Sequence, residues 1–282
     1  MKLLRHGPAG HERPGLVGPD GTMRDLSGVV RDLDAEALSP EGLARLAALD
    51  PAALPAVPEG ARLGPCVPRM TNFVCIGLNY ADHAAETGAA IPKEPIVFLK
   101  SLGALSGPND DVVIPKDSVK TDWEVELAVV IGTRAKNVPE TEALDHVAGY
   151  AVCNDVSERE WQSERGGTWD KGKGADTFGP LGPWLVTKDE VPDPQDLAMR
   201  LEVDGRAMQD GSTRTMIFGV KKLVSYVSHF ITLHPGDVIS TGTPPGVGLG
   251  MKPPTFLKPG QEMRLTVAGL GEQRQRVVAY SG

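Results

Sequence analysis

Short runs of alternating apolar and polar residues, separated by glycine and proline, dominate the chain from residue 70 onward. Such alternation predicts β-strands that turn one face toward a core. We expect strands within these runs: 73–77, 95–100, 111–115, 121–132, 150–155, 182–187, 234–244, 256–269 and 272–280. Residues 197–211 predict a hairpin, because Asp204-Gly205 at its centre are the residue types that a type I′ turn requires.

Helical periodicity is confined to a few segments. The strongest is 220–233, where these apolar residues form one stripe: Val220, Leu223, Val224, Val227 and Phe230. Residues 39–50 predict a short helix with Ser39 as N-cap and Pro40 in the first turn. Shorter helical stretches are expected in 78–88 and near 141–149. The pattern indicates a mixed α/β fold that is mostly β, without the strand-helix alternation of a doubly wound sheet.

The first part of the chain has a different pattern. It contains a turn at 18–22, the short helix and a Pro/Ala-rich stretch at 51–65. We interpret residues 1–69 as a small accessory domain with a linker, and residues 70–282 as the larger catalytic domain.

Composition narrows the class of protein. The 282 residues are 40% hydrophobic and 23% charged, as in ordinary globular proteins, and the formal net charge is −8. That charge argues against nucleic acid or an anionic membrane as partner. No run approaches the roughly 18 apolar residues of a membrane span, and the N-terminus lacks the apolar core of a signal peptide. Three cysteines without C-x-x-C spacing indicate free thiols, so we expect a cytoplasmic enzyme.

Two glutamates, Glu124 and Glu126, stand one residue apart in the expected strand 121–132. On a strand they share a face, about 6.5 Å apart along the axis. Half-buried carboxylates held this way need a positive charge between them, and oxygen ligands favour Mg²⁺, Mn²⁺ or Ca²⁺ over zinc. Alone, such a pair is more often a solvated sheet face. Asp155, after another apolar run, is a third candidate ligand, although Asn-Asp is also ordinary turn chemistry.

A histidine and a glutamate form a candidate general base. His83 and Glu86 lie at i and i+3, neighbours on one helical face. A carboxylate beside an imidazole raises its basicity and fixes its tautomer, which suits activation of water. The competing interpretation is an ordinary surface pair.

Three further segments carry candidate binding groups. Arg159 and Gln162 follow Asp155 by about one turn and suit an anion receptor, or else Arg159 pairs with a neighbouring glutamate. The glycine-rich stretch 165–184 carries Lys173, whose ammonium would offset excess carboxylate charge and stabilise an enolate. Its spacing matches no phosphate-binding loop. The turn 240–248 contains Thr243 and backbone N–H groups that can hold a carboxylate, or it is simply a tight corner.

In chain order, the motifs NYxxHxxE, ExE, DxxxRxxQ, GKxxDTFxPLGP and TGTPxGVG closely resemble the fumarylacetoacetate hydrolase family. The resemblance covers residues 70–282 and implies a β-roll catalytic domain and a homodimer. It implies Mg²⁺ or Mn²⁺ ligands at Glu124, Glu126 and Asp155. It also implies that His83 and Glu86 activate water and that Lys173 is an active-site lysine. The implied substrate contacts are Tyr80, Arg159, Gln162 and Thr243. Gly174-Ala175 and Gly179 depart from the Ser-Phe and Cys of many relatives.

The resemblance implies a hydrolase acting on a carbon–carbon bond of a ketonic substrate. We expect a 2,4-diketo acid, either an acylpyruvate or a 2,4-diketo-3-deoxy sugar acid, with release of pyruvate or a related 2-keto acid. Oxaloacetate decarboxylation, keto-acid tautomerisation and ureidoglycolate lyase activity would use a similar metal-enolate site. A non-catalytic metal-binding module is the remaining alternative.

Overall fold

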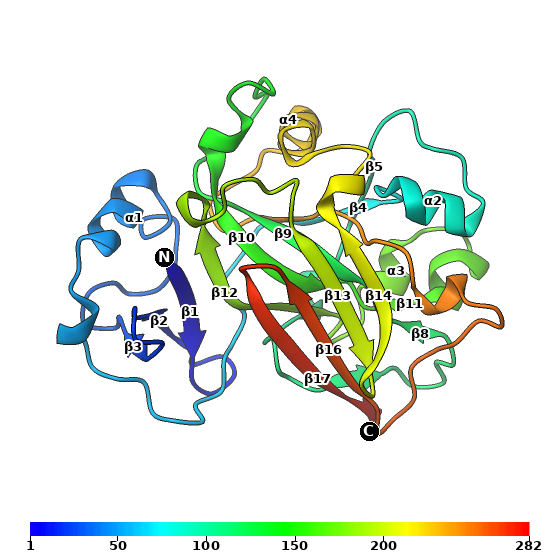
Figure 1. Cartoon of the computed structure of the whole chain (residues 1–282), viewed down its shortest axis with the longest axis horizontal. Helices are drawn as coiled ribbons and strands as arrows, with labels where there is room; N and C mark the ends of the chain where they lie inside the picture. Colours follow the sequence, from blue (N-terminus) through cyan, green and yellow to red (C-terminus); the bar gives the residue numbers. More distant parts are fainter. Residues whose placement is uncertain (282) are drawn as a thin grey trace.

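A ten-stranded sheet forms the centre of the molecule in the computed structural model, which describes residues 1–281 (Figure 1). Its strands are β1 (Lys2–His6), β2 (Arg13–Val17), β3 (Met23–Asp25), β4 (Phe73–Gly77), β5 (Ile96–Leu99), β6 (Leu105–Ser106), β9 (Val125–Ile131), β10 (Val147–Asn154), β12 (Gly179–Thr187) and β15 (Val238–Ser240). They are ordered β3-β2-β1-β12-β10-β9-β15-β4-β5, with β6 beside β12.

A second sheet has five strands in the order β14-β13-β16-β17-β7. These are β7 (Val112–Ile114), β13 (Ala198–Val203), β14 (Arg206–Ser212), β16 (Glu262–Val267) and β17 (Gly271–Ala279). In Figure 1 its long strands lie across β9 and β10, and its apolar residues join the same core. The expected hairpin is confirmed, since Asp204 and Gly205 have φ of 50° and 75° between β13 and β14.

Strand β9 is buried along its whole length. Alternate residues from Val125 to Ile131 pack in the core beneath the second sheet. Ala128 and Val130 face the opposite side and pack in a second core with residues of the N-terminal segment. The expectation of a half-buried face is therefore wrong, because both faces of this central strand are covered. The run 121–132 is also interrupted, so that β8 (Thr121–Asp122) pairs separately with β11 (Ser157–Glu158).

The helices are short and lie around the sheets. They are α1 (Pro40–Ala47), α2 (Ala81–Thr87), α3 (Asp170–Lys173) and α4 (Val220–Phe230), with a π-helical turn at Glu160–Glu164 and 3₁₀ turns at Pro51–Ala53, Leu102–Ala104, Ala143–His146, Lys188–Glu190, Thr213–Thr215 and Gly248–Gly250. The Ser39 side chain accepts from the Gly42 N–H, which confirms the predicted cap. The predicted stripe on α4 is buried except Phe230, which is 66% exposed. That residue ends the helix, where its ring packs on Tyr226 instead of the core.

The N-terminal strands continue the large sheet. Leu3 of β1 pairs with Leu185 of β12, and Leu3 and Leu16 pack in the same core as Val130 of β9. Side chains also connect residues 1–69 to the rest of the chain. Arg62 donates to the Asp110 carboxylate through two nitrogens. The division at residue 69 stays a prediction. The mixed, mostly β class is confirmed, and no helix within residues 1–281 is long and apolar enough to cross a membrane.

Candidate active site

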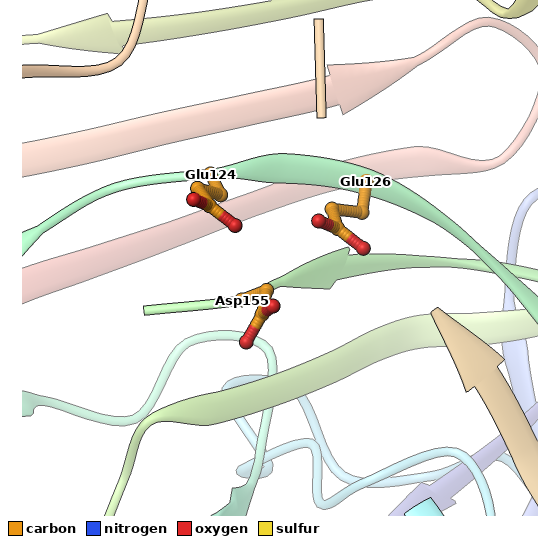
Figure 2. A group of neighbouring side chains, drawn as sticks. All are labelled: Glu124, Glu126 and Asp155. Carbon is orange, nitrogen blue, oxygen red and sulfur yellow. The ribbon is translucent and has the colours of Figure 1, made fainter. Parts of the chain in front are cut away.

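Strand register places three carboxylates on one face. Cys153 of β10 lies opposite Glu126 of β9, and two residues further along the pair the Asp155 N–H donates to the Glu124 carbonyl at 2.9 Å. Opposed residues share a face, as do residues two apart on one strand. Figure 2 shows Glu124 and Glu126 along one ribbon and Asp155 on the next. One oxygen from each lies within 4.8 Å of the others, and all three residues are buried.

Two cations neutralise part of this acidic group. Lys173 Nζ lies 2.7 Å from Glu124 Oε2 and 2.8 Å from Asp155 Oδ2, while Arg159 Nη2 lies 2.7 Å from Glu124 Oε1. Burial would raise the pKa of Glu124, but these two charges outweigh it and lower the pKa to about 2. Burial likewise opposes the charge of Lys173, yet Asp155 and Glu124 raise the pKa of its ammonium. Both groups are therefore charged at neutral pH.

Glu126 is in a different environment. Its Oε2 accepts from the Ser240 hydroxyl and from the Gly242 N–H, at 2.9 Å for the latter. Burial raises the pKa of Glu126 well above the usual range, and the charges of Asp155 and Glu124 raise it further. Glu126 is thus the carboxylate whose ionisation most needs an added positive charge.

The donor set fits a hard divalent cation. All three groups offer oxygen, the ligand type that Mg²⁺ and Mn²⁺ prefer. Asp155 Oδ1 is buried without a hydrogen bond of regular geometry, although Lys100 Nζ lies 2.6 Å from it. With Asp122, which binds Arg159, the cluster holds four carboxylates and three cations, leaving one formal negative charge. A divalent cation would reverse that sign and favour an anionic substrate.

The predicted base pair lies on α2 beside this cluster. His83 Nδ1 is 3.1 Å from Glu86 Oε2, and His83 lines the same cavity as the three carboxylates. Glu86 Oε1 also accepts from the Gly246 N–H at 3.0 Å. The helix is therefore fastened to the turn 242–248, and its histidine faces the acidic cluster.

The cavity, of about 80 Å³, has a charged floor and an apolar wall. It is lined by Ile76, Gly77, Leu78, His83, Phe98, Glu124, Glu126, Asp155, Arg159, Gln162, Trp169, Lys173, Gly242 and Thr243. Phe98 and Trp169 meet edge to face, with ring centroids 5.4 Å apart, and Lys173 Nζ lies 5.4 Å from the Phe98 ring. A Cβ at Gly77 would lie 2.2 Å from Trp169 Cζ3, so this glycine makes room for the indole.

Arg159 and Gln162 both line the cavity, as predicted substrate contacts should. Arg159 is already held on several sides, since Nε donates to Asp122 Oδ2 at 2.8 Å and Nη1 donates to Gln162 Oε1 at 3.0 Å. With Glu124 on Nη2, the guanidinium is bound mainly by the protein. Its clearest role in this geometry is to orient Gln162 and Glu124.

The other two predicted contacts differ in position. Thr243 lines the cavity, but its hydroxyl donates to the Val125 carbonyl at 2.9 Å and accepts from Gln209 Nε2 at 2.7 Å. Tyr80 is fully buried and its hydroxyl contacts Met199 Sδ at 3.2 Å. It is not among the lining residues, so the structure does not bring Tyr80 to the cavity.

The turn 242–248 binds carboxylates, but those of the protein itself. The N–H groups of Gly242, Gly246 and Gly248 donate to Glu126, Glu86 and Asp122, respectively. These three N–H groups therefore bind carboxylates of the chain itself, and a role of the turn in holding a substrate carboxylate stays a prediction. One loop supports a candidate metal ligand, the base pair and the anchor of Arg159.

Two buried side chains of the cluster were not predicted. Asp122 accepts from Arg159 Nε and from the N–H groups of Gly248 and Leu249. Lys100 contacts Asp155. Lys100 ends the apolar run 95–100 and Asp122 precedes the run 125–131, but no local pattern indicates the partner of either residue.

Comparisons with known proteins identify the family of the chain. The family model described as fumarylacetoacetate (FAA) hydrolase C-terminal matches residues 72–278. A protein of Burkholderia ambifaria, provisionally named a hydrolase, is 64% identical over 276 residues, covering 98% of each chain. The structure of 5-carboxymethyl-2-hydroxymuconate delta-isomerase from Mycobacterium smegmatis is 32% identical, with TM-score 0.77 and 100% of both chains covered.

A second similar protein has been solved with a metal ion bound. Maleylpyruvate hydrolase from Sphingobium sp. SYK-6, in complex with manganese(II) ion and pyruvate, is 30% identical with TM-score 0.82, again over 100% of both chains. Match length and identity together decide the assignment. The chain belongs to the fumarylacetoacetate hydrolase family.

Proposed function

We propose that the protein is a metal-dependent hydrolase that cleaves a carbon–carbon bond of a 2,4-diketo acid and releases pyruvate or a related 2-keto acid. The observation that carries the proposal is one cavity lined by three clustered carboxylates, by Lys173 and by His83. The manganese and pyruvate in the similar maleylpyruvate hydrolase support it. An acylpyruvate or a 2,4-diketo-3-deoxy sugar acid is the proposed substrate.

Glu124, Glu126 and Asp155 would hold the metal, for which we propose Mg²⁺ or Mn²⁺. When bound, such an ion supplies Lewis-acid polarisation of the 2-oxo acid end of the substrate. Gln162 borders the cavity and is the proposed contact for that end, with Arg159 fixing it in place. Thr243 borders the same cavity and would have to release its bond to the Val125 carbonyl to donate to substrate.

His83 and Glu86 activate water in this proposal. With Nδ1–H donating to Glu86, the Nε2 atom of His83 takes a proton from water. The resulting hydroxide forms a C–O bond at the distal carbonyl, the adjacent C–C bond breaks, and its electron pair passes to the enolate of the 2-keto acid. The Lys173 ammonium stabilises that negative charge, and the proton taken up by His83 passes to the enolate carbon, which restores the neutral imidazole and completes the reaction.

A chelator and a substrate panel test the proposal. EDTA should abolish turnover and added Mg²⁺ or Mn²⁺ should restore it, with pyruvate followed through a coupled dehydrogenase. The panel contains acylpyruvates, 2,4-diketo sugar acids and oxaloacetate. Full activity in excess chelator would contradict the metal, and a metal-loaded protein inert toward every compound would favour a non-catalytic module.

Isomerisation is the second candidate, favoured by the similar delta-isomerase. Both it and oxaloacetate decarboxylation need a stabilised enolate but no attacking water. His83→Ala separates the classes, because it should remove hydrolysis and spare decarboxylation.

We also propose a cytoplasmic homodimer. Several large apolar side chains are exposed and would gain from burial against a second copy, namely Val119 (68%), Phe230 (66%), Ile91 (60%) and Tyr280 (55%). All three cysteines are free and buried, as a reducing compartment allows. Light scattering of the purified protein would decide the assembly.

A further inference from the structure

Lys100 is a fully buried lysine outside the cavity lining. It follows β5, its side chain is 0% exposed, and its N–H donates to the Phe73 carbonyl of β4 at 2.9 Å. Lysine is almost never fully buried unless its charge is paired. Its stem passes Gly179, where a Cβ would lie 3.3 Å from Lys100 Cδ and 2.9 Å from Phe73 Cε1. The sheet therefore fixes where this ammonium can lie.

The ammonium contacts three groups, matching its three N–H donors. Nζ lies 2.6 Å from Asp155 Oδ1 and donates to the carbonyls of Val156, at 3.2 Å, and Lys173. These three contacts surround Nζ, and Lys100 is not among the residues that line the cavity, so its ammonium does not face a substrate there. It is thus not a catalytic residue.

The groups that Lys100 contacts belong to two parts of the site whose relative position matters for metal binding. Asp155 is a candidate metal ligand, and Lys173 carries the ammonium that contacts Asp155 Oδ2 from the other side. Lys100 joins the segment after β10 to the end of α3 through one atom. Groups that orient a metal ligand influence metal affinity and activity although they do not touch the metal.

We propose that Lys100 is a positioning residue that orients the Asp155 carboxylate toward the metal and fixes Lys173 relative to it. The inference rests on the metal site of the proposed function. The inference predicts in which direction the metal affinity changes when Lys100 is replaced. Removing a nearby positive charge would by itself tighten cation binding, whereas loss of positioning weakens it.

The test compares Lys100→Met with Lys171→Met, the same change at an exposed lysine of α3. Mn²⁺ binding is measured by calorimetry without substrate, and kcat and KM are measured at saturating Mn²⁺. We expect Lys100→Met to weaken Mn²⁺ binding about 10- to 100-fold and to lower kcat more than it raises KM. Lys171→Met should stay within twofold of wild type.

The outcomes are separable. Unchanged or tighter Mn²⁺ binding by a folded Lys100→Met would overturn the positioning role, whereas failure of the wild type to bind Mn²⁺ would overturn the proposed function itself. If the methionine variant does not fold, Lys100→Arg keeps the charge but not the three-donor geometry. That variant should also lose Mn²⁺ affinity, and wild-type affinity in it would equally overturn the proposal.

Discussion

The Gly246 N–H donates to the carboxylate of Glu86 at 3.0 Å across 160 positions of sequence. The same carboxylate contacts His83 Nδ1. The turn 242–248 therefore sets the orientation of the imidazole, and the base depends on a contact between α2 and a distant loop. This geometry makes the water-activating pair testable on its own.

His83→Ala should lower the hydrolysis of an acylpyruvate about 100-fold or more, the usual contribution of a general base. Oxaloacetate decarboxylation, which needs no water attack, should change less than twofold. Pyruvate release reports both reactions. Ala85→Ser, at an exposed position of the same helix, is the control and should retain activity. Hydrolysis by His83→Ala within twofold of wild type would remove the base assignment.

Metal affinity should depend on pH through Glu126. Because burial and the charges of Asp155 and Glu124 raise the pKa of Glu126, a proton competes with the metal for this carboxylate. Below the raised pKa, each unit of increasing pH should strengthen Mn²⁺ binding about tenfold, and the slope should vanish above that pKa. Calorimetry in buffers of different ionisation enthalpy would count the released proton.

Two variants control the pH experiment. Glu126→Gln should bind Mn²⁺ weakly at every pH, since it removes a ligand charge. Glu86→Gln alters a glutamate outside the ligand set and should keep the wild-type slope. An affinity that does not vary with pH in the wild type would show that Glu126 is ionised throughout.

Lys173→Met should reduce kcat about 100-fold or more, because the enolate loses its ammonium partner. The variant also leaves Glu124 and Asp155 short of a cation, and breaking a buried pair costs about 3–5 kcal/mol. Added Mn²⁺ should recover part of the lost thermal stability. Wild-type kcat in this variant would exclude the proposed role, and Lys171→Met is again the matched control.

Gly77→Ala tests the apolar wall. The new Cβ would lie 2.2 Å from Trp169 Cζ3, so the indole must shift, which disturbs its edge-to-face contact with Phe98. We expect a destabilisation of about 1–3 kcal/mol and a raised KM with nearly unchanged Mn²⁺ affinity. Gly28→Ala, where nothing lies within 4 Å of the new Cβ, is the control. An unaltered KM would mean that substrate does not contact this wall.

Local patterns predicted most elements and part of the site. The E-x-E spacing places Glu124 and Glu126 on one face wherever the strand lies. That Asp155 joins them depends on the pairing of β9 with β10, which local periodicity does not determine; here the family motif identified it. Lys100 and Asp122 were missed for the same reason, since their partners come from distant segments.

Two expectations failed because of tertiary context. A half-buried face was predicted for β9, but packing on both sides buried it completely. Phe230 has helical spacing, yet it lies where α4 ends and the core is no longer beneath it. Periodicity reports which residues share a face, and the surrounding layers decide whether that face is covered.

The pairing of β1 with β12 has a consequence for the solution behaviour of a shortened chain. Without residues 1–69, the N–H and C=O groups around Leu185 and Val186 would form a bare strand edge, a template for pairing with other molecules. The apolar surface now covered by Leu3 and Leu16 would face water beside it. We therefore expect the N-terminal strands to protect the protein from aggregation, independently of any part in catalysis.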